Sequence, residues 1–511
     1  MKELKNFMEQ QAVCQTADTV NAENFSAWRQ TVKTALDQLA MTGSLGSSFY
    51  ASAKELSQDA LKVLDQAEAE DLAQAIVKGR NEGFIRTFPI LGLVVLSQKD
   101  SALFRQVFNQ VILTGNDLVD FIDLTHKTRG FGRAVKSAIR SYLETHVSPY
   151  YAMKYRKQLA DAIRLSRFKG DDAIYSYILS VYPETKGYSE EKLAAAYEQY
   201  AELAKRKEFI GLLEEGRKAE AAALLSDSDI DVDSLTAYYA KFDREIWQAV
   251  AKRTPLMKFL KYLAKFQREG VELAELAKEK ITVANLQRAK VFPFRLVTAE
   301  LALHGVEEEA FGSVREILLG VLDDYTDRYD WSDFNRYRWV IAPDVSGSMG
   351  SQIGRSSVLT FAHISAMFTA FFRRGLDQVE VLPWDTEVHS FDVLKNDSVR
   401  TQMDAMLKMV GGGTHMEVSV EHMIKHRIMT DYAVFLTDTE EYGRGWLKSW
   451  KKYRKMNPNA KAFLLRADTY LTAPISEADA EKYGIIQIFG WNDSVMDYIH
   501  YCITEKEHEH D

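Results

Sequence analysis

Cysteine is the residue that this 511-residue chain has least of, with only Cys14 and Cys502, near opposite ends. Two cysteines exclude a cysteine zinc cluster and a disulfide framework, and such scarcity is typical of proteins in a reducing cytosol. The N-terminus has no apolar segment of the signal-peptide kind, and the longest apolar run, 88–96, is far shorter than the roughly 20 residues that span a bilayer. We therefore expect a cytoplasmic protein.

Proline is also scarce, with nine residues in the whole chain. Over residues 1–330, apolar side chains recur every three or four positions, as at Leu56, Ala60 and Val63, and few runs are rich in β-formers. No strict repeat occurs at a fixed period. Paired helices over this length nevertheless favour an α-solenoid of degenerate repeats, with a plain helical bundle as the alternative.

After a polar, aromatic connector at 323–337 the pattern changes. Short β-rich runs alternate with amphipathic helices, which predicts a mostly parallel sheet with helices on both faces. We therefore expect a mainly α-helical chain with two domains, 1–330 and 331–511, the second an α/β doubly wound fold. The expected strands are 337–343, 378–384, 432–438, 460–466 and 484–490, and the expected helices are 356–374, 397–409, 417–429, 444–456 and 492–503.

The first of these strands leads directly into an acid and two serines, Asp344, Ser346 and Ser348. Side chains at alternate positions of an extended turn face the same way. Two later segments end at the same edge of the predicted sheet: Thr414 follows three glycines, and Asp438 ends a strand. Carboxylate and hydroxyl oxygens suit Mg²⁺, the ion we expect first, or Mn²⁺ or Ca²⁺. The alternative is that the acid–serine pattern only caps the following helix.

An enzymatic interpretation of these serines is weak. The chain has no G-x-S-x-G elbow, and neither His363 nor His415 has a recognisable base-and-orienter spacing to Ser346 or Ser348. His363 falls within an apolar helical pattern, which favours a packed residue, and His415 stands beside Thr414, where it could contact the surroundings of a metal. We expect no catalytic set and no enzyme.

Positive charge is concentrated in residues 127–169, which carry eleven Lys or Arg against Glu144 and Asp161. This net charge of +9 stands in a chain whose total is −9. Solvated charged faces usually mix signs, and like charges at helical spacing repel, so rows without counter-charges favour a bound polyanion. The rows are Arg133, Lys136 and Arg140 on one expected helix, and Lys154, Lys157 and Arg164, followed by Arg167 and Lys169, on the next.

Four aromatic residues lie among these cations: Phe131, Tyr150, Tyr151 and Phe168. Aromatic rings can stack on unpaired bases, the usual device for holding single-stranded RNA. The same rings could equally belong to the hydrophobic core.

Several segments, in order, resemble the TROVE module of the Ro ribonucleoprotein family: "FPILGLVVLS", "RGFGRAVKSAIRSYL", "YAMKYRKQLADAIRLSRFKG", "EIWQAVAKRTPLMKFLKYLAKF" and "KVFPFRLVTAELAL". The acid–serine turn with "GGGT" and "LTDTE" resembles a von Willebrand factor A domain with a metal-ion-dependent adhesion site. The resemblance covers nearly the whole chain and is to bacterial Ro proteins. It implies a ring of HEAT-like repeats closed by the A-type domain, with the metal held by Asp344, Ser346, Ser348, Thr414 and Asp438.

The resemblance also implies partners. It implies binding of small non-coding Y-type RNA and of the single-stranded 3′ ends of misfolded or unprocessed RNAs, in RNA quality control, by a monomer that also works with polynucleotide phosphorylase. A metal-dependent adhesion-type module on a helical scaffold is the alternative function. The cations expected to bind RNA are Arg129, Arg133, Lys136, Arg140, Lys154, Arg156, Lys157, Arg164, Arg167 and Lys169.

Overall fold

The structure is a computed structural model, and it describes residues 17–20, 26–41, 53–83, 85–128, 130–289, 291–303, 308–353, 358–438, 445–466, 472–490 and 495–504. The chain is mainly helical, as predicted, with a parallel sheet near the C-terminus. In the described part of the chain, every helix is too short or too polar to cross a membrane.

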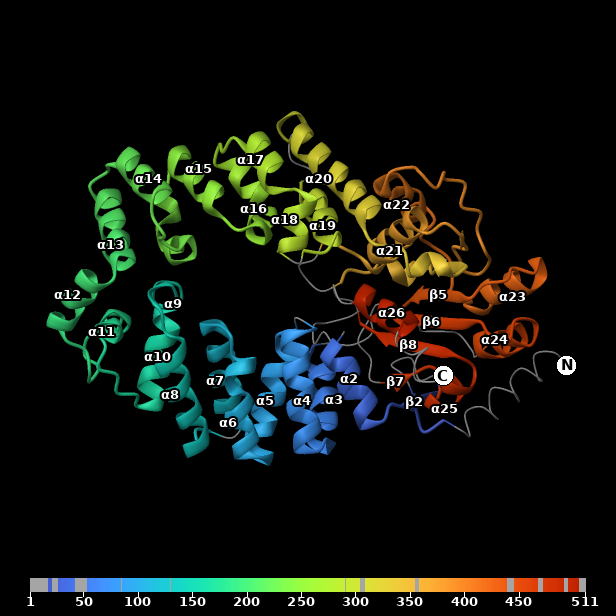
Figure 1. Cartoon of the computed structure of the whole chain (residues 1–511), viewed down its shortest axis with the longest axis horizontal. Coiled ribbons are helices and arrows are strands. Elements are labelled where there is room, and N and C mark those ends of the chain that lie inside the picture. The colour runs from blue at the N-terminus through green and yellow to red at the C-terminus, as the bar shows by residue number, and fades with distance from the viewer. Residues whose placement is uncertain are drawn as a thin grey trace.

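The N-terminal two thirds of the chain is a succession of helices that pack against their neighbours along the chain, the pattern of an α-solenoid (Figure 1). They are α2 Val32–Met41, α3 Ala53–Gln66, α4 Ala69–Asn81, α5 Thr87–Lys99, α6 Ser101–Val111, α7 Gly115–Thr128, α8 Arg133–His146, α9 Pro149–Lys154, α10 Arg156–Ser166, α11 Ala173–Leu179, α12 Glu190–Gln199, α13 Ala201–Glu214, α14 Lys218–Ser226, the 3-10 helix η1 Val232–Lys241, α15 Arg244–Arg253, α16 Leu256–Arg268, α17 Leu273–Lys280, α18 Val283–Arg288, α19 Phe294–Ala302 and α20 Glu308–Arg328.

These helices begin where the sequence offers caps and bury their apolar stripes. Asp100, for example, accepts hydrogen bonds from the Ala102 and Leu103 amides at 2.7 and 2.9 Å and so starts α6. One hydrophobic core runs under the helices from Leu36 to Leu203, and a second begins at Phe209. The array is therefore held by local packing between successive helices, as in a solenoid.

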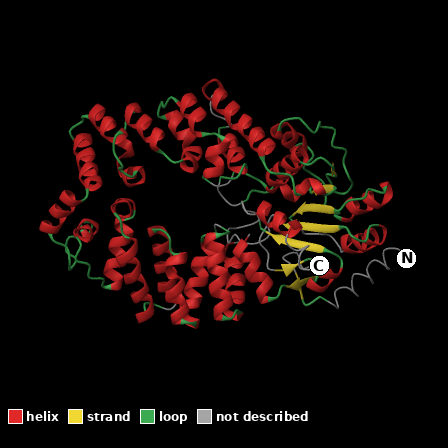
Figure 2. Ribbon diagram, in the orientation of Figure 1, coloured by secondary structure: helices red, strands yellow, loops and turns green. Residues whose placement is uncertain are grey.

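The C-terminal third, which we call the A-type domain, carries a five-stranded parallel sheet in the order β4-β3-β5-β6-β8 (Figure 2). All five predicted strands and the helices between them are present. The elements are η2 Phe334–Arg336, β3 Trp339–Pro343, η3 Gly347–Gly350, α21 Phe361–Gly375, β4 Val379–Val381, α22 Val399–Leu407, α23 Glu417–His426, β5 Tyr432–Thr437, α24 Gly445–Met456, β6 Lys461–Arg466, β7 Thr472–Ala473, α25 Glu477–Lys482, β8 Ile485–Phe489 and α26 Val495–Thr504.

Helices cover both faces of this sheet, so its strands are apolar on both sides. On one face, α21 and α26 pack Phe372 and Ile499 against Ile341. On the other, α23 and α24 pack Met423 and Trp450 against the sheet. Two covered faces are what a doubly wound parallel sheet requires.

Pro343 ends β3 without disturbing it. The pairing of β3 with β4 ends at Ile341 and Val381, whereas the pairing with β5 continues to Pro343 and Leu436. Beyond β4 the Trp384 amide still donates to the Pro343 carbonyl at 3.0 Å, and the Val345 amide donates to the Trp384 carbonyl at 2.9 Å. The missing proline amide therefore does not stop the strand from pairing on this side.

The helical array is joined to the A-type domain at both of its ends (Figure 1). At the far end, the core under α13–α20 continues into α21 and α22, and the buried carboxylate of Glu300 binds Arg315 at 2.8 Å and also Arg400 of α22. At the near end, β2 (Ser26–Arg29) pairs with β7, and β1 (Thr19–Val20) pairs with β2. The array therefore closes into a ring through the A-type domain, as the family resemblance implies.

Gln38 of α2 makes the near-end junction specific. Its side-chain amide donates to the Gln487 carbonyl at 2.9 Å, and its carbonyl accepts from the Phe489 amide at 3.1 Å. Both backbone groups belong to β8, the edge strand of the sheet, so one glutamine occupies positions that an added strand would otherwise fill.

Two features differ from the prediction. The small antiparallel sheet β1-β2-β7 was not expected, because its strands are two to four residues long and its pairing joins opposite ends of the chain. The second basic helix is also not continuous. It is broken at Tyr155, whose backbone has φ −117° and ψ 29° and whose ring is buried against Gly115.

Candidate metal centre and nucleic-acid interface

The acid–serine turn lies at the carboxyl edge of the sheet, where neighbouring strands β3 and β5 end. The Asp344 amide donates to the Leu436 carbonyl at 2.8 Å, which holds the first acid beside the end of β5. Asp438 follows that strand by one residue, and both carboxylates are buried, with 1 % of their surface exposed. The register thus brings together two acids that are 94 residues apart in sequence.

Hydrogen bonds fix the Asp344 carboxylate in this turn. One oxygen, Oδ1, accepts from the Ser346 amide at 2.8 Å, and the other, Oδ2, accepts from the Thr437 hydroxyl at 2.6 Å. The Ser346 and Ser348 hydroxyls lie 3.2 Å apart. The sequence prediction therefore placed three of these side chains on one turn correctly, but it missed Thr437, which stands directly before the predicted Asp438.

The glycine loop is bound to the turn through its backbone. The Gly411 amide donates to the Val345 carbonyl at 2.8 Å, and the Gly347 amide donates to the Gly412 carbonyl at 3.2 Å. Gly412 has φ +72°, and a Cβ added there would lie 2.4 Å from Asp385 Oδ2. Only glycine suits such a position, and Thr414 follows this anchored segment.

Asp385 is a residue of this edge that the sequence analysis missed. It follows β4, and its Oδ1 accepts from the Glu387 amide at 3.1 Å and lies 2.9 Å from His389 Nε2. Its carbonyl accepts from the His415 amide at 2.8 Å, so it braces the loop that carries Thr414. Its position after a predicted strand was the available signal, because every strand of a parallel sheet ends at this edge.

Charge at this edge favours a cation. Burial, together with the nearby Asp438 carboxylate, raises the pKa of Asp344 to about 7. Two buried acids beside hydroxyl oxygens form a hard donor set of the kind that Mg²⁺, Mn²⁺ and Ca²⁺ prefer. In the described part of the chain no three His, Cys, Asp or Glu side chains form a metal cluster. A metal here would therefore depend on Ser346, Ser348 and Thr414 as well as on the acids, and this set fits it.

The two histidines weighed in the sequence analysis have local roles. His363 lies at the start of α21, where its amide donates to the Thr360 hydroxyl and its Nδ1 accepts from the Thr360 amide at 3.2 Å. It thus forms a capping box rather than simply packing in the helix. His415 is exposed, and its Nδ1 lies 3.4 Å from Glu417.

The first predicted row of cations lies on α8, on the helical array and far from the sheet (Figure 1). Val135, Ile139 and Tyr142 are buried, as predicted for the packing face. Arg133 is exposed and Lys136 half-buried. The exposed Arg140 also donates through Nε to the Ser166 carbonyl at 2.8 Å, which ties α8 to the end of α10.

The second row is divided by the break at Tyr155, so Lys154 ends α9 whereas Lys157 and Arg164 lie on α10. Lys154 Nζ lies 3.1 Å from Asp233 of η1 and 3.0 Å from the Tyr150 hydroxyl. This lysine therefore links α9 to a later part of the array. The predicted single line of Lys154, Lys157 and Arg164 is wrong, because the Tyr155 backbone turns the chain between the first two.

Two further predicted cations also have contacts within the fold. Arg156 donates to the Tyr177 carbonyl at 3.0 Å and to the Ser180 hydroxyl, so its guanidinium serves packing between α10 and α11. Arg164 lies 3.9 Å from Asp161 and 4.4 Å from the centre of the Tyr182 ring, but it remains exposed. The predicted Arg129 lies outside the described residues.

The remaining cations form an open surface. Lys157, Arg167 and Lys169 are exposed, and Arg167 ends α10 in a left-handed conformation with φ +57°. Six cations of this region have no carboxylate within 4.0 Å among the residues that the structure describes. We call these six the array cations. The array cations are Arg133, Lys136, Arg140, Lys157, Arg167 and Lys169.

The four aromatic residues of this region divide between surface and core. Tyr150 exposes 46 % of its surface, whereas Phe168 exposes 8 % and packs edge-on against Tyr175. Phe131 and Tyr151 are half-buried. Tyr150 is therefore the ring best placed to stack on a base, and Phe168 belongs to the core.

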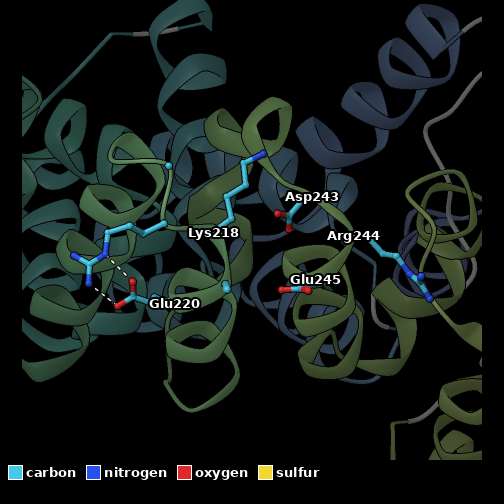
Figure 3. A pocket seen from close by; sticks show the side chains of 8 residues that line it. Lys218, Glu220, Asp243, Arg244 and Glu245 are labelled. Atoms are coloured by element: carbon cyan, nitrogen blue, oxygen red, sulfur yellow. Dashed lines mark hydrogen bonds and ion pairs between the residues drawn. The ribbon is translucent and has the colours of Figure 1, made fainter.

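A pocket elsewhere on the array offers a contrast. It lies between the starts of α14 and α15, where Lys218 and Arg244 are interspersed with Glu220, Asp243 and Glu245 (Figure 3). Arg217 at its rim binds Glu215 at 3.0 Å. Signs are mixed here, as on an ordinary solvated surface, whereas the array cations have no such partner among the residues that the structure describes.

Comparisons with known proteins found matches to the A-type domain and to the fold of the chain. Residues 338–502, from just before β3 into α26, match the sequence model of the Ro60 vWA domain. The solved structure of the Deinococcus radiodurans Ro (Rsr) protein is similar to 93 % of this chain and covers 99 % of its own, with a TM-score of 0.64 at 15 % sequence identity. Residues 338–502 are therefore similar in sequence to the Ro60 vWA domain, and the chain shares the fold of the Deinococcus radiodurans Ro (Rsr) protein over 93 % of its length.

Proposed function

We propose that this protein is a non-catalytic RNA-binding protein of the Ro type, in which the array cations hold the phosphate backbone. The single observation that supports this most strongly is that six cations on neighbouring helices lie without described carboxylate partners. Cations arranged in this way gain from displacing the counterions of a polyanion. The exposed Tyr150 beside them adds a stacking surface for an unpaired base.

The finer assignments follow from the family resemblance and are part of the proposal. The RNAs are a small Y-type RNA and misfolded or unprocessed RNAs with single-stranded 3′ ends, and the process is RNA quality control. Polynucleotide phosphorylase is the proposed protein partner. In the A-type domain, Asp344, Ser346, Ser348, Thr414 and Asp438 would hold one divalent cation, whose chemistry would be to bind an acidic group of a partner.

The test is salt-dependent binding of an RNA that has a stem and a single-stranded 3′ tail. If about six phosphates are neutralised, the slope of log affinity against log salt should be about −4 to −5. The matched control is the double variant Lys218→Glu/Arg244→Glu in the mixed-sign pocket, which changes net charge as much as a double reversal among the array cations. A slope near zero, or an equal loss of affinity in the control, would contradict the proposal.

The alternative, an adhesion-type module, rests on the metal-site geometry alone. Under it, EDTA would abolish capture of a protein partner while RNA binding stayed weak and insensitive to salt. The two proposed functions predict different affinities and salt slopes for RNA, so RNA binding is measured first.

A further inference from the structure

Two histidines lie four residues apart near the end of α23, on the side of the A-type domain that faces away from the helical array (Figure 1). The rings of His422 and His426 stack, with centroids 4.2 Å apart and planes inclined by 29°. His426 is exposed and His422 is half-buried, so solvent reaches the pair. Side chains at positions i and i+4 share one face of a helix, and an ion from solvent can therefore contact both rings at once.

Most other histidines of the described chain already have a polar partner. Five of them have a hydroxyl or carboxylate oxygen within 3.4 Å of a ring nitrogen. These five are His146, His363, His389, His415 and His500. Within the described ranges, by contrast, neither His422 nor His426 makes a hydrogen bond or an ion pair. Their ring nitrogens can therefore turn toward a common ligand without breaking an existing contact.

The fold fixes the helix end that carries the two rings. Val420 and Met423, on the buried side of α23, are fully buried against the sheet. The Ile428 amide donates to the Met423 carbonyl at 2.9 Å, and the Ile428 carbonyl accepts from the Tyr453 hydroxyl of α24 at 2.9 Å. The backbone is thus held in place, and only side-chain rotation is needed to aim the rings, which keeps the cost of binding low.

The chemical state and spacing of the rings suit metal binding. Burial, with His426 and Lys425 nearby, lowers the pKa of His422 from its ordinary value of 6.5. This ring is therefore neutral at pH 7, and neutral imidazole is the form that binds a metal. A metal–nitrogen bond of about 2.0–2.1 Å places two ligand nitrogens about 3.3 Å apart in a tetrahedral site. Rings whose centres lie 4.2 Å apart need only turn to reach this separation.

The donor atoms select a different class of ion from the one expected at the acid–serine turn. Imidazole nitrogen suits Cu²⁺, Ni²⁺ and Zn²⁺, whereas Mg²⁺ and Ca²⁺ prefer oxygen ligands. Among these ions the usual order of affinity places Cu²⁺ above Zn²⁺. In the described part of the chain, no third His, Cys, Asp or Glu completes a cluster with the pair. Water would therefore fill the remaining coordination positions.

Positive charge beside the pair opposes the binding of a cation. Lys425 directly precedes His426 and is close enough to His422 to lower the pKa of that ring. A neighbouring unit charge repels a divalent ion, although water and salt screen exposed charges strongly. Lys425 thus weakens metal binding but would strengthen the binding of a polyanion. Removal of this charge distinguishes the two kinds of ligand.

We propose that His422 and His426 bind one divalent transition-metal ion of the class that imidazole prefers, such as Cu²⁺ or Zn²⁺. This site goes beyond the proposed function, because it does not depend on RNA binding and its ion differs in class from the one proposed at the acid–serine turn. An ion that bridges positions i and i+4 also holds the last turn of α23 in its helical form.

The test is titration of the full-length chain with Cu²⁺ and with Zn²⁺ in a large excess of Mg²⁺, which occupies the acid–serine turn. The starting protein carries His508→Gln/His510→Gln, because these two histidines could bind the same ions. On this background His422→Ala and His426→Ala are the test variants. His126→Ala is the matched control, since His126 is a single exposed histidine on α7.

We expect one tightly bound ion per chain, with Cu²⁺ bound more tightly than Zn²⁺. Electron paramagnetic resonance should show two imidazole nitrogens on Cu²⁺ in the starting protein and one in each test variant. Each test variant should bind either ion at least about ten-fold more weakly, and the control should bind as the starting protein does. Lys425→Gln should tighten binding by about two- to five-fold, because it removes a repelling charge.

Several results would overturn this inference. They are displacement of the bound ion by Mg²⁺, unchanged affinity in both test variants, an equal loss in His126→Ala, and weaker binding in Lys425→Gln. None of them bears on the RNA-binding proposal, which the salt slope tests separately. An unchanged melting temperature without metal shows that a variant is folded, and the exposed His426→Ala decides the question if His422→Ala does not fold.

Discussion

The two candidate sites of this chain differ in how the fold holds them. The acids at the end of β3 and β5 are buried, and a strand register and backbone hydrogen bonds fix them. The array cations are mostly exposed, and the fold fixes their helices but leaves the ends of the side chains in solvent. A buried charge needs a partner, which the proposed metal would supply. An exposed charge is already solvated by water, so it binds only a ligand that interacts with it more favourably than water does. The comparison predicts that the two sites respond differently to mutation, pH and salt.

The largest effect is expected at the exposed array cations, on RNA affinity. Arg133→Glu with Lys136→Glu should weaken RNA binding by more than about two orders of magnitude, because each reversal turns a phosphate attraction into a repulsion. The melting temperature should stay within about one or two degrees of the wild type, since neither side chain has a described carboxylate partner. Filter binding or fluorescence anisotropy measures the affinity, and Lys218→Glu/Arg244→Glu is the control. A loss below ten-fold would contradict the assignment of α8 to RNA.

The next largest effect is expected at the buried acids, on the stability that Mg²⁺ adds to the A-type domain. In wild-type protein, Mg²⁺ at about a hundred times its Kd should stabilise the A-type domain by about 2.7 kcal/mol, and Asp344→Ala should abolish this gain. RNA affinity should remain unchanged in this variant. Thermal unfolding with Mg²⁺ and with EDTA gives the readout, with the exposed Asp392→Ala as the control. Metal-independent unfolding of the wild type would show that the acid–serine turn holds no cation.

The same site should give a pH dependence of definite sign. Burial and the nearby Asp438 raise the pKa of Asp344 from its ordinary value of 3.8 to about 7. In EDTA the folded protein thus keeps a proton that the unfolded chain loses near pH 4, so the contribution of this group to stability is lost as the pH rises from about 4 to 7. Because a metal binds the ionised carboxylate, stabilisation by Mg²⁺ should be larger at pH 8 than at pH 6. An equal gain at both pH values would contradict the assignment of Asp344 as a ligand.

What could be predicted from the sequence also differs between the buried metal site and the exposed array cations. The parallel sheet was predictable because each strand is a short apolar run ended by polar residues, and the meeting of Asp344 with Asp438 follows from the parallel order alone. Asp385 was missed although it follows a predicted strand, and Thr437 was missed as well. Only the folded loops show that Asp385 braces the glycine segment and that the Thr437 hydroxyl donates to Asp344. Residue types and strand edges were therefore sufficient to propose metal ligands, but not to find the residues that hold the proposed ligands in place.

On the helical array, the sequence predicted which helix faces are charged but not which charges have partners. The periodicity of α8 correctly separated Val135 and Ile139 from Arg133. It could not reveal that the chain turns at Tyr155, because the ring packs against Gly115, some 40 residues earlier in the sequence. Nor could it show that Lys154 reaches Asp233, a contact between repeats. Long-range pairing of exposed side chains has no local signature.

Alanine substitutions at two neighbouring glycines in the loop of the buried site should differ moderately in their effect on stability. Gly412→Ala places a Cβ against Asp385 in a backbone with φ +72°, and it should cost about 1–3 kcal/mol of stability and weaken Mg²⁺ binding. At Gly411 nothing lies within 4 Å of an added Cβ, so Gly411→Ala is the matched control and should change little. Equal effects of the two substitutions would mean that the loop is not anchored as described. Calorimetry gives both quantities.

The smallest effect tests whether the cations of one region divide into structural and binding groups. Lys157→Ala should reduce the salt slope of RNA binding by about 1, with a loss of affinity of about ten-fold or less and no change in stability, because Lys157 is exposed. Lys154→Ala should instead lower stability by about 0.5–1 kcal/mol, since it removes contacts to Asp233 and the Tyr150 hydroxyl. Its salt slope should change less than that of Lys157→Ala.

The reverse pattern would alter the comparison between the two sites. If Lys154→Ala reduced the salt slope as much as Lys157→Ala and left the melting temperature unchanged, the bond to Asp233 would have to open when RNA binds. Lys258 also contacts Asp233, so this carboxylate would keep one partner after the release. Exposed cations could then exchange an internal acid for a phosphate at little cost, which the buried acids of the A-type domain cannot do, because their positions are set by a strand register.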